Sequence, residues 1–110
     1  MKVRLVKKNT ITKYVSINRN SKPSFDLWLN KLKRANWRNT NEIKDTFRTA
    51  DIIGKSSNRI VFNIGGNNYR MICTYHFGSK NVHLFINWIG THAQYDKLCD
   101  KNLQYTINEY

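Results

Sequence analysis

Three segments in the C-terminal half constrain the fold most strongly, because their apolar side chains recur with the two-residue period of a strand. They are residues 59–64, 69–77 and 81–89, and all three are rich in Ile, Val, Phe, Tyr and Trp. The connections "GGNN" and "GSKN" consist largely of Gly and Asn, which readily adopt the positive φ angles of hairpin turns. The pattern therefore predicts an antiparallel meander of three strands.

One further strand and two helices are expected before the meander. "KVRLV" at residues 2–6 alternates apolar and basic side chains, so we expect a half-buried strand in the same sheet. Asn9 can cap a short helix. The strongest helical pattern lies in "SKPSFDLWLNKLKRANW", where four apolar residues share one face: Phe25, Trp28, Leu29 and Leu32.

The polar stretch at residues 39–58 is expected to be a loop with one short turn of helix around residues 45–48. Helices that precede a meander predict an α+β domain with both N-terminal helices on one face of an antiparallel sheet of about four strands. The other face is expected to stay partly open. With 110 residues, the chain is expected to form a single domain over residues 1–110.

The charge of the chain points to a polyanionic partner. Nineteen Lys and Arg residues oppose seven Asp and Glu residues, for a net charge of +12. Residues 1–59 alone hold fifteen basic and four acidic residues. RNA or DNA is the first candidate, an acidic protein the second and an anionic membrane surface the third. The candidate RNA-binding residues are Lys31, Lys33, Arg34, Arg38 and Arg59.

No apolar run approaches the length of a membrane span. The start, "MKVRLVKKN", lacks the apolar stretch and cleavage site of a signal peptide. We therefore expect a cytoplasmic protein that does not act at a membrane, with Cys73 and Cys99 as reduced thiols.

The stretch "GTHAQYDK", residues 90–97, places three proton-handling side chains within five residues. Thr91 followed by Gln94 is a capping-box pattern, which predicts a short C-terminal helix that begins at His92. His92, Tyr95 and Asp96 then stand at positions i, i+3 and i+4, so they should be neighbours on one surface. The positive end of the helix favours a neutral imidazole ring, which can accept a proton.

Arg70 is the charged residue of the middle strand. Alternation puts it on the face away from the helices, where an arginine is costly unless it meets a carboxylate or an anionic ligand. A structural ion pair, with Asp96 or Asp51, is therefore the alternative to anion binding. His92 and Tyr95 also have ordinary structural interpretations. His92 can form a hydrogen bond at the helix cap, and Tyr95 can bury its ring while its hydroxyl contacts water.

Motifs for cofactor chemistry are absent from the sequence. It has no phosphate-binding glycine loop and no cluster of metal ligands, so we expect neither a cofactor nor a metal. A basic surface with one arginine, one histidine and one tyrosine suits RNA cleavage, in which the 2′-hydroxyl is a built-in nucleophile that needs deprotonation and alignment. The side chains supply general base catalysis and charge stabilisation.

Four stretches resemble the HigB toxins of bacterial toxin–antitoxin systems, within the RelE-like superfamily of mRNA interferases. They are "SFDLWLNKLKRANW", "FRTADIIG", "RIVFNIGGNNYRMI" and "INWIGTHAQYDKL". The resemblance implies a compact domain with two helices against a curved antiparallel sheet. It also implies cleavage of mRNA, in many relatives on the ribosome, which inhibits translation, and a helix-turn-helix antitoxin of the HigA type.

Within these stretches, Arg70 matches the strand arginine of an "NxYR" motif, and His92, Tyr95 and Asp96 match "THxxYD". Our hypothesis is a metal-independent endoribonuclease in which Arg70 binds the scissile phosphate and His92 acts as the base. Tyr95 orients the substrate or shares proton transfer, and Asp96 supports the site structurally, by positioning Arg70 or by capping the site. The alternative is a non-catalytic, basic RNA- or DNA-binding protein.

Overall fold

The computed structural model describes residues 1–54 and 56–110. The helices are α1 (Asn9–Ile17), α2 (Lys22–Lys33), α3 (Thr40–Thr46) and α4 (His92–Asp100), with short 3₁₀ turns at Arg19–Ser21 and Leu103–Tyr105. The strands are β1 (Lys2–Val6), β2 (Asp51–Ile53), β3 (Arg59–Ile64), β4 (Tyr69–Phe77) and β5 (Asn81–Thr91). The chain is therefore an α+β domain, as predicted.

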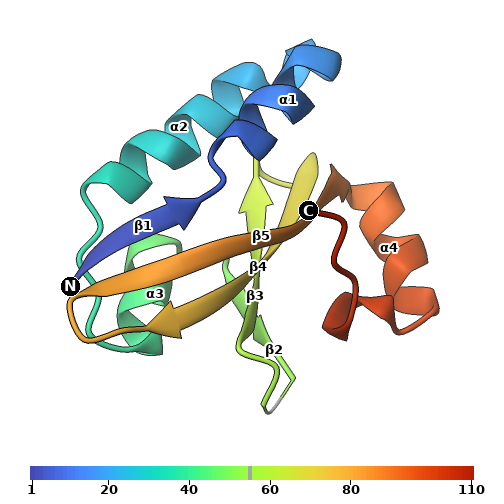
Figure 1. Cartoon of the computed structure of the whole chain (residues 1–110). Coiled ribbons are helices and arrows are strands. Elements are labelled where there is room, and N and C mark those ends of the chain that lie inside the picture. The colour runs from blue at the N-terminus through green and yellow to red at the C-terminus, as the bar shows by residue number, and fades with distance from the viewer. Residues whose placement is uncertain (55) are drawn as a thin grey trace.

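The strands form one sheet in the order β1-β5-β4-β3-β2 (Figure 1). The antiparallel meander of β3, β4 and β5 confirms the prediction from alternation. β1 joins the sheet as expected but runs parallel to β5, so the prediction of a wholly antiparallel sheet of about four strands is wrong. Alternation shows which face of a strand is buried, whereas strand direction depends on the path of the chain through the intervening helices.

The polar stretch at residues 39–58 contains a helix and a strand that were not predicted. Asn39 caps α3 by accepting a hydrogen bond from the backbone N–H of Glu42, and Ile43 anchors the helix in the core. The predicted turn at residues 45–48 therefore covers only the end of a longer helix. The three residues of β2 pair with β3 and are too few to show a period.

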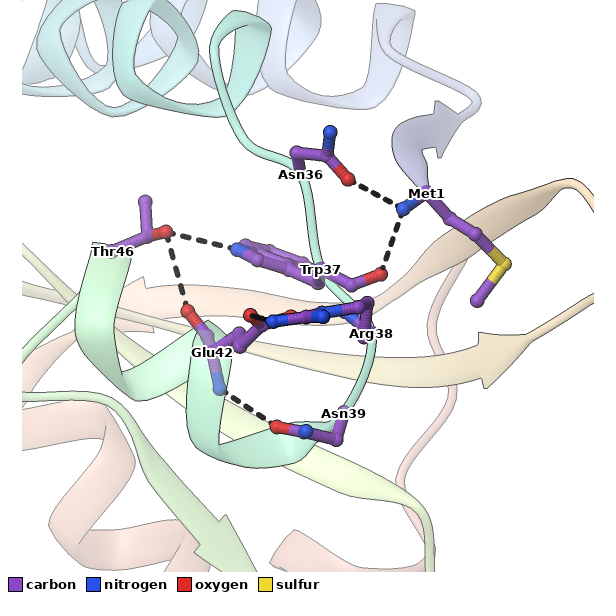
Figure 2. Close-up of polar contacts among 7 residues, drawn as sticks. All are labelled: Met1, Asn36, Trp37, Arg38, Asn39, Glu42 and Thr46. Atoms are coloured by element: carbon purple, nitrogen blue, oxygen red, sulfur yellow. Dashed lines mark hydrogen bonds and ion pairs between the residues drawn. The ribbon is translucent and has the colours of Figure 1, made fainter.

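A network of polar contacts ties the start of β1 to the connection between α2 and α3 (Figure 2). The amino group of Met1 donates to the side-chain oxygen of Asn36 and to the carbonyl of Trp37. The Trp37 indole N–H donates to Thr46 Oγ1 at 2.9 Å, which fixes the end of α3 beneath α2. The basic helix α2 is thus held in a defined position.

One face of the sheet carries the main core, which α1, α2 and α3 cover (Figure 1). Phe25, Trp28 and Leu32 are buried as the spacing along α2 predicts. Trp28 packs against Phe47 and Phe62, with ring centroids 5.4 and 5.1 Å away. These aromatic contacts hold α2 and the end of α3 against β3.

The opposite face is partly covered by α4 and the C-terminal segment (Figure 1). Ile72 and Trp88 from the sheet pack there against Leu98 of α4, which forms a second, smaller core. Phe85 stays exposed on β5, so this face is partly open, as expected.

Candidate functional site

The start of α4 is built by the last residues of β5. The backbone N–H of Gln94 donates to Thr91 Oγ1 at 3.2 Å, and the N–H of Thr91 donates to Gln94 Oε1 at 2.9 Å, which confirms the predicted capping box. Gly90 leaves room for this box, since a Cβ there would lie 2.4 Å from the Trp88 ring and 2.8 Å from Gln94 Oε1.

The same region meets the start of β4. Tyr69 pairs with Thr91 and Arg70 pairs with Gly90 across the ladder. The backbone N–H of His92 donates to the carbonyl of Asn68 at 3.1 Å. The β3–β4 turn and the first turn of α4 therefore lie at one end of the sheet (Figure 1).

Arg70 lies at this end of the sheet and is only 8% exposed. Nη1 donates to its neighbour's carbonyl, that of Tyr69, at 3.1 Å, and Nη2 donates to Asn67 Oδ1 at 3.4 Å. Arg70 was expected on the face away from the N-terminal helices, which was expected to stay partly open, but α4 packs over part of this face and Arg70 is buried. Asn67 was missed by the sequence reasoning, although it begins the "NxYR" motif.

No carboxylate in the described part of the chain lies within ion-pair distance of Arg70. The structure therefore does not contain the ion pair considered with Asp96 or Asp51. Burying a cation without a counter-ion is costly, and an anionic ligand relieves that cost. Of the two interpretations of Arg70, the absence of a counter-ion among the described residues favours anion binding.

Tyr95 lies half-buried one turn after His92, with its ring centroid 6.1 Å from that of Trp88. Burial raises the pKa of Tyr95 well above its usual value, and Cys99 and Asp51 add to the rise, while Arg70 opposes it. A phenol with such a pKa keeps its proton at neutral pH and acts as a hydrogen-bond donor.

His92 and Asp96 lie beside each other on the exposed side of α4. His92 Nε2 is 3.6 Å from Asp96 Oδ2, which is an ion pair when the ring is protonated. Asp96 thus contacts His92, and the expectation that it positions Arg70 is not met. The i, i+4 spacing makes this pair local to the helix, whereas Arg70 belongs to β4.

The predicted basic residues of α2 and its end lie on the surface. Lys31, Lys33 and Arg34 are exposed and line a depression of about 690 Å³ beside α2. Arg38 is also exposed but pairs with Glu42, at 3.4 Å, so part of its charge is compensated.

Arg59 does not belong to this basic surface. It is buried at the start of β3, and burial lowers the pKa of its guanidinium. Nη1 donates to the carbonyls of Gln104 and Ile107, at 3.3 and 2.7 Å. The expectation that Arg59 binds RNA is therefore corrected: its side chain holds the C-terminal segment against the sheet.

The described residues include no group of three or more His, Cys, Asp or Glu side chains placed to hold a metal ion. Nor does any described helix have both the length and the apolar character needed to cross a membrane.

Residues 21–98 match the protein-family model described as HigB_toxin, RelE-like toxic component of a toxin–antitoxin system. The matched range contains α2, the whole meander, Arg70 and most of α4. No curated protein matches the chain.

Proposed function

Because the chain belongs to the HigB toxin family of RelE-like toxic components of toxin–antitoxin systems, we propose that it is a metal-independent endoribonuclease that cleaves mRNA and so inhibits translation. Family membership makes it a toxin and implies an antitoxin as its partner. We further propose that the antitoxin is a helix-turn-helix protein of the HigA type, that cleavage takes place on the ribosome, and that the protein acts in the cytoplasm.

One observation carries the enzymatic proposal: a buried arginine without a carboxylate partner among the described residues lies at the end of the sheet where α4 presents His92 and Tyr95. The 3.4 Å contact between Arg70 and Asn67 is longer than most hydrogen bonds. Phosphate oxygens can therefore replace Asn67 as the partner of the guanidinium at little cost. Bidentate contact with phosphate is the geometry that arginine favours.

The proposed reaction is an attack of the ribose 2′-oxygen on the adjacent phosphorus. His92 accepts the 2′-hydroxyl proton, and Asp96 beside Nε2 stabilises the imidazolium that forms. Arg70 stabilises the extra negative charge on the phosphorane. Tyr95 keeps its proton and donates a hydrogen bond that orients the phosphate. The bond to the 5′-oxygen then breaks, and that oxygen takes a proton from solvent, which leaves a 2′,3′-cyclic phosphate and a 5′-hydroxyl end.

The test is to incubate the protein with matched oligonucleotides in the presence of a metal chelator. We expect an RNA strand to be cut and a 2′-O-methyl strand of the same sequence to stay whole, because methylation removes the nucleophile. Mass spectrometry of the products should show a 2′,3′-cyclic phosphate. Intact RNA with retained RNA binding, both free and with ribosomes present, would favour the alternative of a non-catalytic RNA-binding protein.

The basic residues of α2 are proposed to hold the RNA backbone. Replacing Lys31, Lys33 and Arg34 with glutamine should weaken binding of single-stranded RNA and make it less salt-dependent. Each lost phosphate contact lowers the slope of log K against log salt concentration by about 0.7, so three contacts lower it by about 2. Fluorescence anisotropy over a salt series measures this slope.

The matched control removes three exposed lysines from the region of α1, namely Lys7, Lys8 and Lys13. It changes the net charge equally but leaves the α2 surface intact. If the slope fell equally for both triple variants, the basic residues of α2 would contribute no more to RNA binding than the lysines near α1.

A further inference from the structure

A groove of about 550 Å³ runs between α2, the segment that follows α3, and the β3–β4 turn. Its volume lies in the range of about 300–1,000 Å³ that is typical of small-ligand sites. The lining residues that matter here are Leu27, Trp28, Phe47, Arg48, Asn63 and Asn67.

The groove combines an apolar wall with polar side chains. Leu27 is 66% exposed, whereas Phe25, Trp28 and Leu32 of the same helix are buried. Trp28 is only 4% exposed, yet its indole N–H has no hydrogen-bond partner among the described residues. A buried donor without a partner is uncommon and is satisfied when a ligand supplies an acceptor.

The groove leads directly to the proposed active site. Asn67 lines it, and the same side chain accepts the hydrogen bond from Arg70 Nη2. Asn63 also lines it and stands opposite Arg70 in the β3–β4 ladder. A ligand in the groove therefore lies next to a phosphate at Arg70.

The charge around the groove matches a nucleic acid. Lys31 and Arg48 belong to its lining. Lys31, Leu27 and Thr46 also line the neighbouring depression that holds the other α2 cations, so the two hollows adjoin. Single-stranded RNA presents unstacked bases that proteins hold by apolar contact and by hydrogen bonds to the base edges.

We propose that this groove is a nucleotide subsite, which holds one unstacked base of the RNA beside the phosphodiester at Arg70. Leu27 supplies the apolar wall. The side-chain oxygen of Asn63, whose Nδ2 already donates to the Thr49 carbonyl at 3.2 Å, the amide NH₂ of Asn67 and the indole N–H of Trp28 supply hydrogen bonds to the base. The proposal rests on the proposed function, because it assigns the ligand of the same site. It makes the groove the place where the enzyme selects its position on the RNA.

The experiment uses two uncleavable probes with equal charge: a mixed-sequence 2′-O-methyl RNA hexamer, and an abasic hexamer with the same sugar–phosphate backbone. The groove variant is Leu27→Ala with Arg48→Ala, both at exposed positions. The matched control is Ile17→Ala with Arg19→Ala, an exposed apolar and basic pair at the end of α1 and in the turn that follows it. Fluorescence anisotropy gives the affinity of each protein for each probe.

We expect the wild-type protein and the control variant to bind the base-containing hexamer about tenfold more tightly than the abasic hexamer, because a held base contributes on that order. The groove variant should lose most of this tenfold preference. In ¹H–¹⁵N spectra of the wild-type protein, the indole resonance of Trp28 should shift with the base-containing probe and not with the abasic probe.

An equal preference for the base-containing probe in all three proteins would overturn the subsite. If the same groove variant also failed to bind the antitoxin, the groove would be assigned to the protein partner. Neither probe can be cleaved, so the binding experiment is independent of the cleavage test. If natural RNA stayed intact, the proposed endoribonuclease activity would be refuted, and the binding result would still stand.

Discussion

An Arg70→Ala variant is expected to cleave RNA about 10²–10³-fold more slowly than the wild-type protein, as removal of one donor to a developing oxyanion does in other enzymes. The guanidinium belongs to the start of β4 and has no carboxylate partner among the described residues, and its present contacts are the Tyr69 carbonyl and Asn67. The effect should appear chiefly in kcat, because the phosphorane carries more negative charge than the bound phosphodiester. Single-turnover cleavage of a labelled RNA strand measures it.

Since Arg70 is buried, its loss could also disturb packing, so urea denaturation of the same variant accompanies the assay. Arg19→Ala removes an exposed arginine and is the control for charge. His92 is exposed, so the His92→Ala variant should keep the wild-type stability. It should cleave RNA about 10²–10⁴-fold more slowly, because it lacks the general base. If both Arg70→Ala and His92→Ala fold normally and cleave at the wild-type rate, the site assignment is wrong.

An Arg59→Ala variant is expected to lose about 2–3 kcal/mol of its free energy of unfolding, the range for hydrogen bonds made by a charged group together with the partners left unpaired. The guanidinium donates to two carbonyls of the C-terminal segment, those of Gln104 and Ile107. Without it, this segment should separate from β3 more often. Urea denaturation gives the stability, and amide hydrogen exchange should show faster exchange after Leu103.

The control for Arg59 is Arg19→Ala, which removes an exposed charge and should change the stability by no more than about 0.5 kcal/mol. RNA affinity of folded Arg59→Ala should match that of the wild-type protein, because the side chain faces the chain's own backbone. Unchanged stability with weaker RNA binding would restore Arg59 to the RNA-binding surface.

Local signals explain the parts of the fold that the sequence predicted. The capping box of Thr91 and Gln94 spans four residues, and its outcome follows from helix geometry alone. It placed His92, Tyr95 and Asp96 on one helix, where the structure shows His92 beside Asp96. The meander likewise follows from alternation and from short turns rich in Gly and Asn.

Long-range contacts explain the parts of the fold that the sequence did not predict. Arg70 was expected on an exposed face because alternation cannot show that α4 returns to cover that face. Polar composition concealed α3, whose only strong local signals are the Asn39 cap and the buried Ile43. The groove was not predicted at all, since its walls come from α2, the segment after α3 and the β3–β4 turn.

By itself, then, the sequence determined the α+β class, the helices α1, α2 and α4, the meander and the side chains gathered at the start of α4. All of these depend on residues within a few positions of one another. Only the tertiary structure decided the parallel pairing of β1, the burial of Arg59 and Arg70 and the groove beside Asn67. Arg59 donates to carbonyls that lie 45 and 48 positions further along the chain. No local sequence pattern indicates which distant backbone groups a buried arginine will contact.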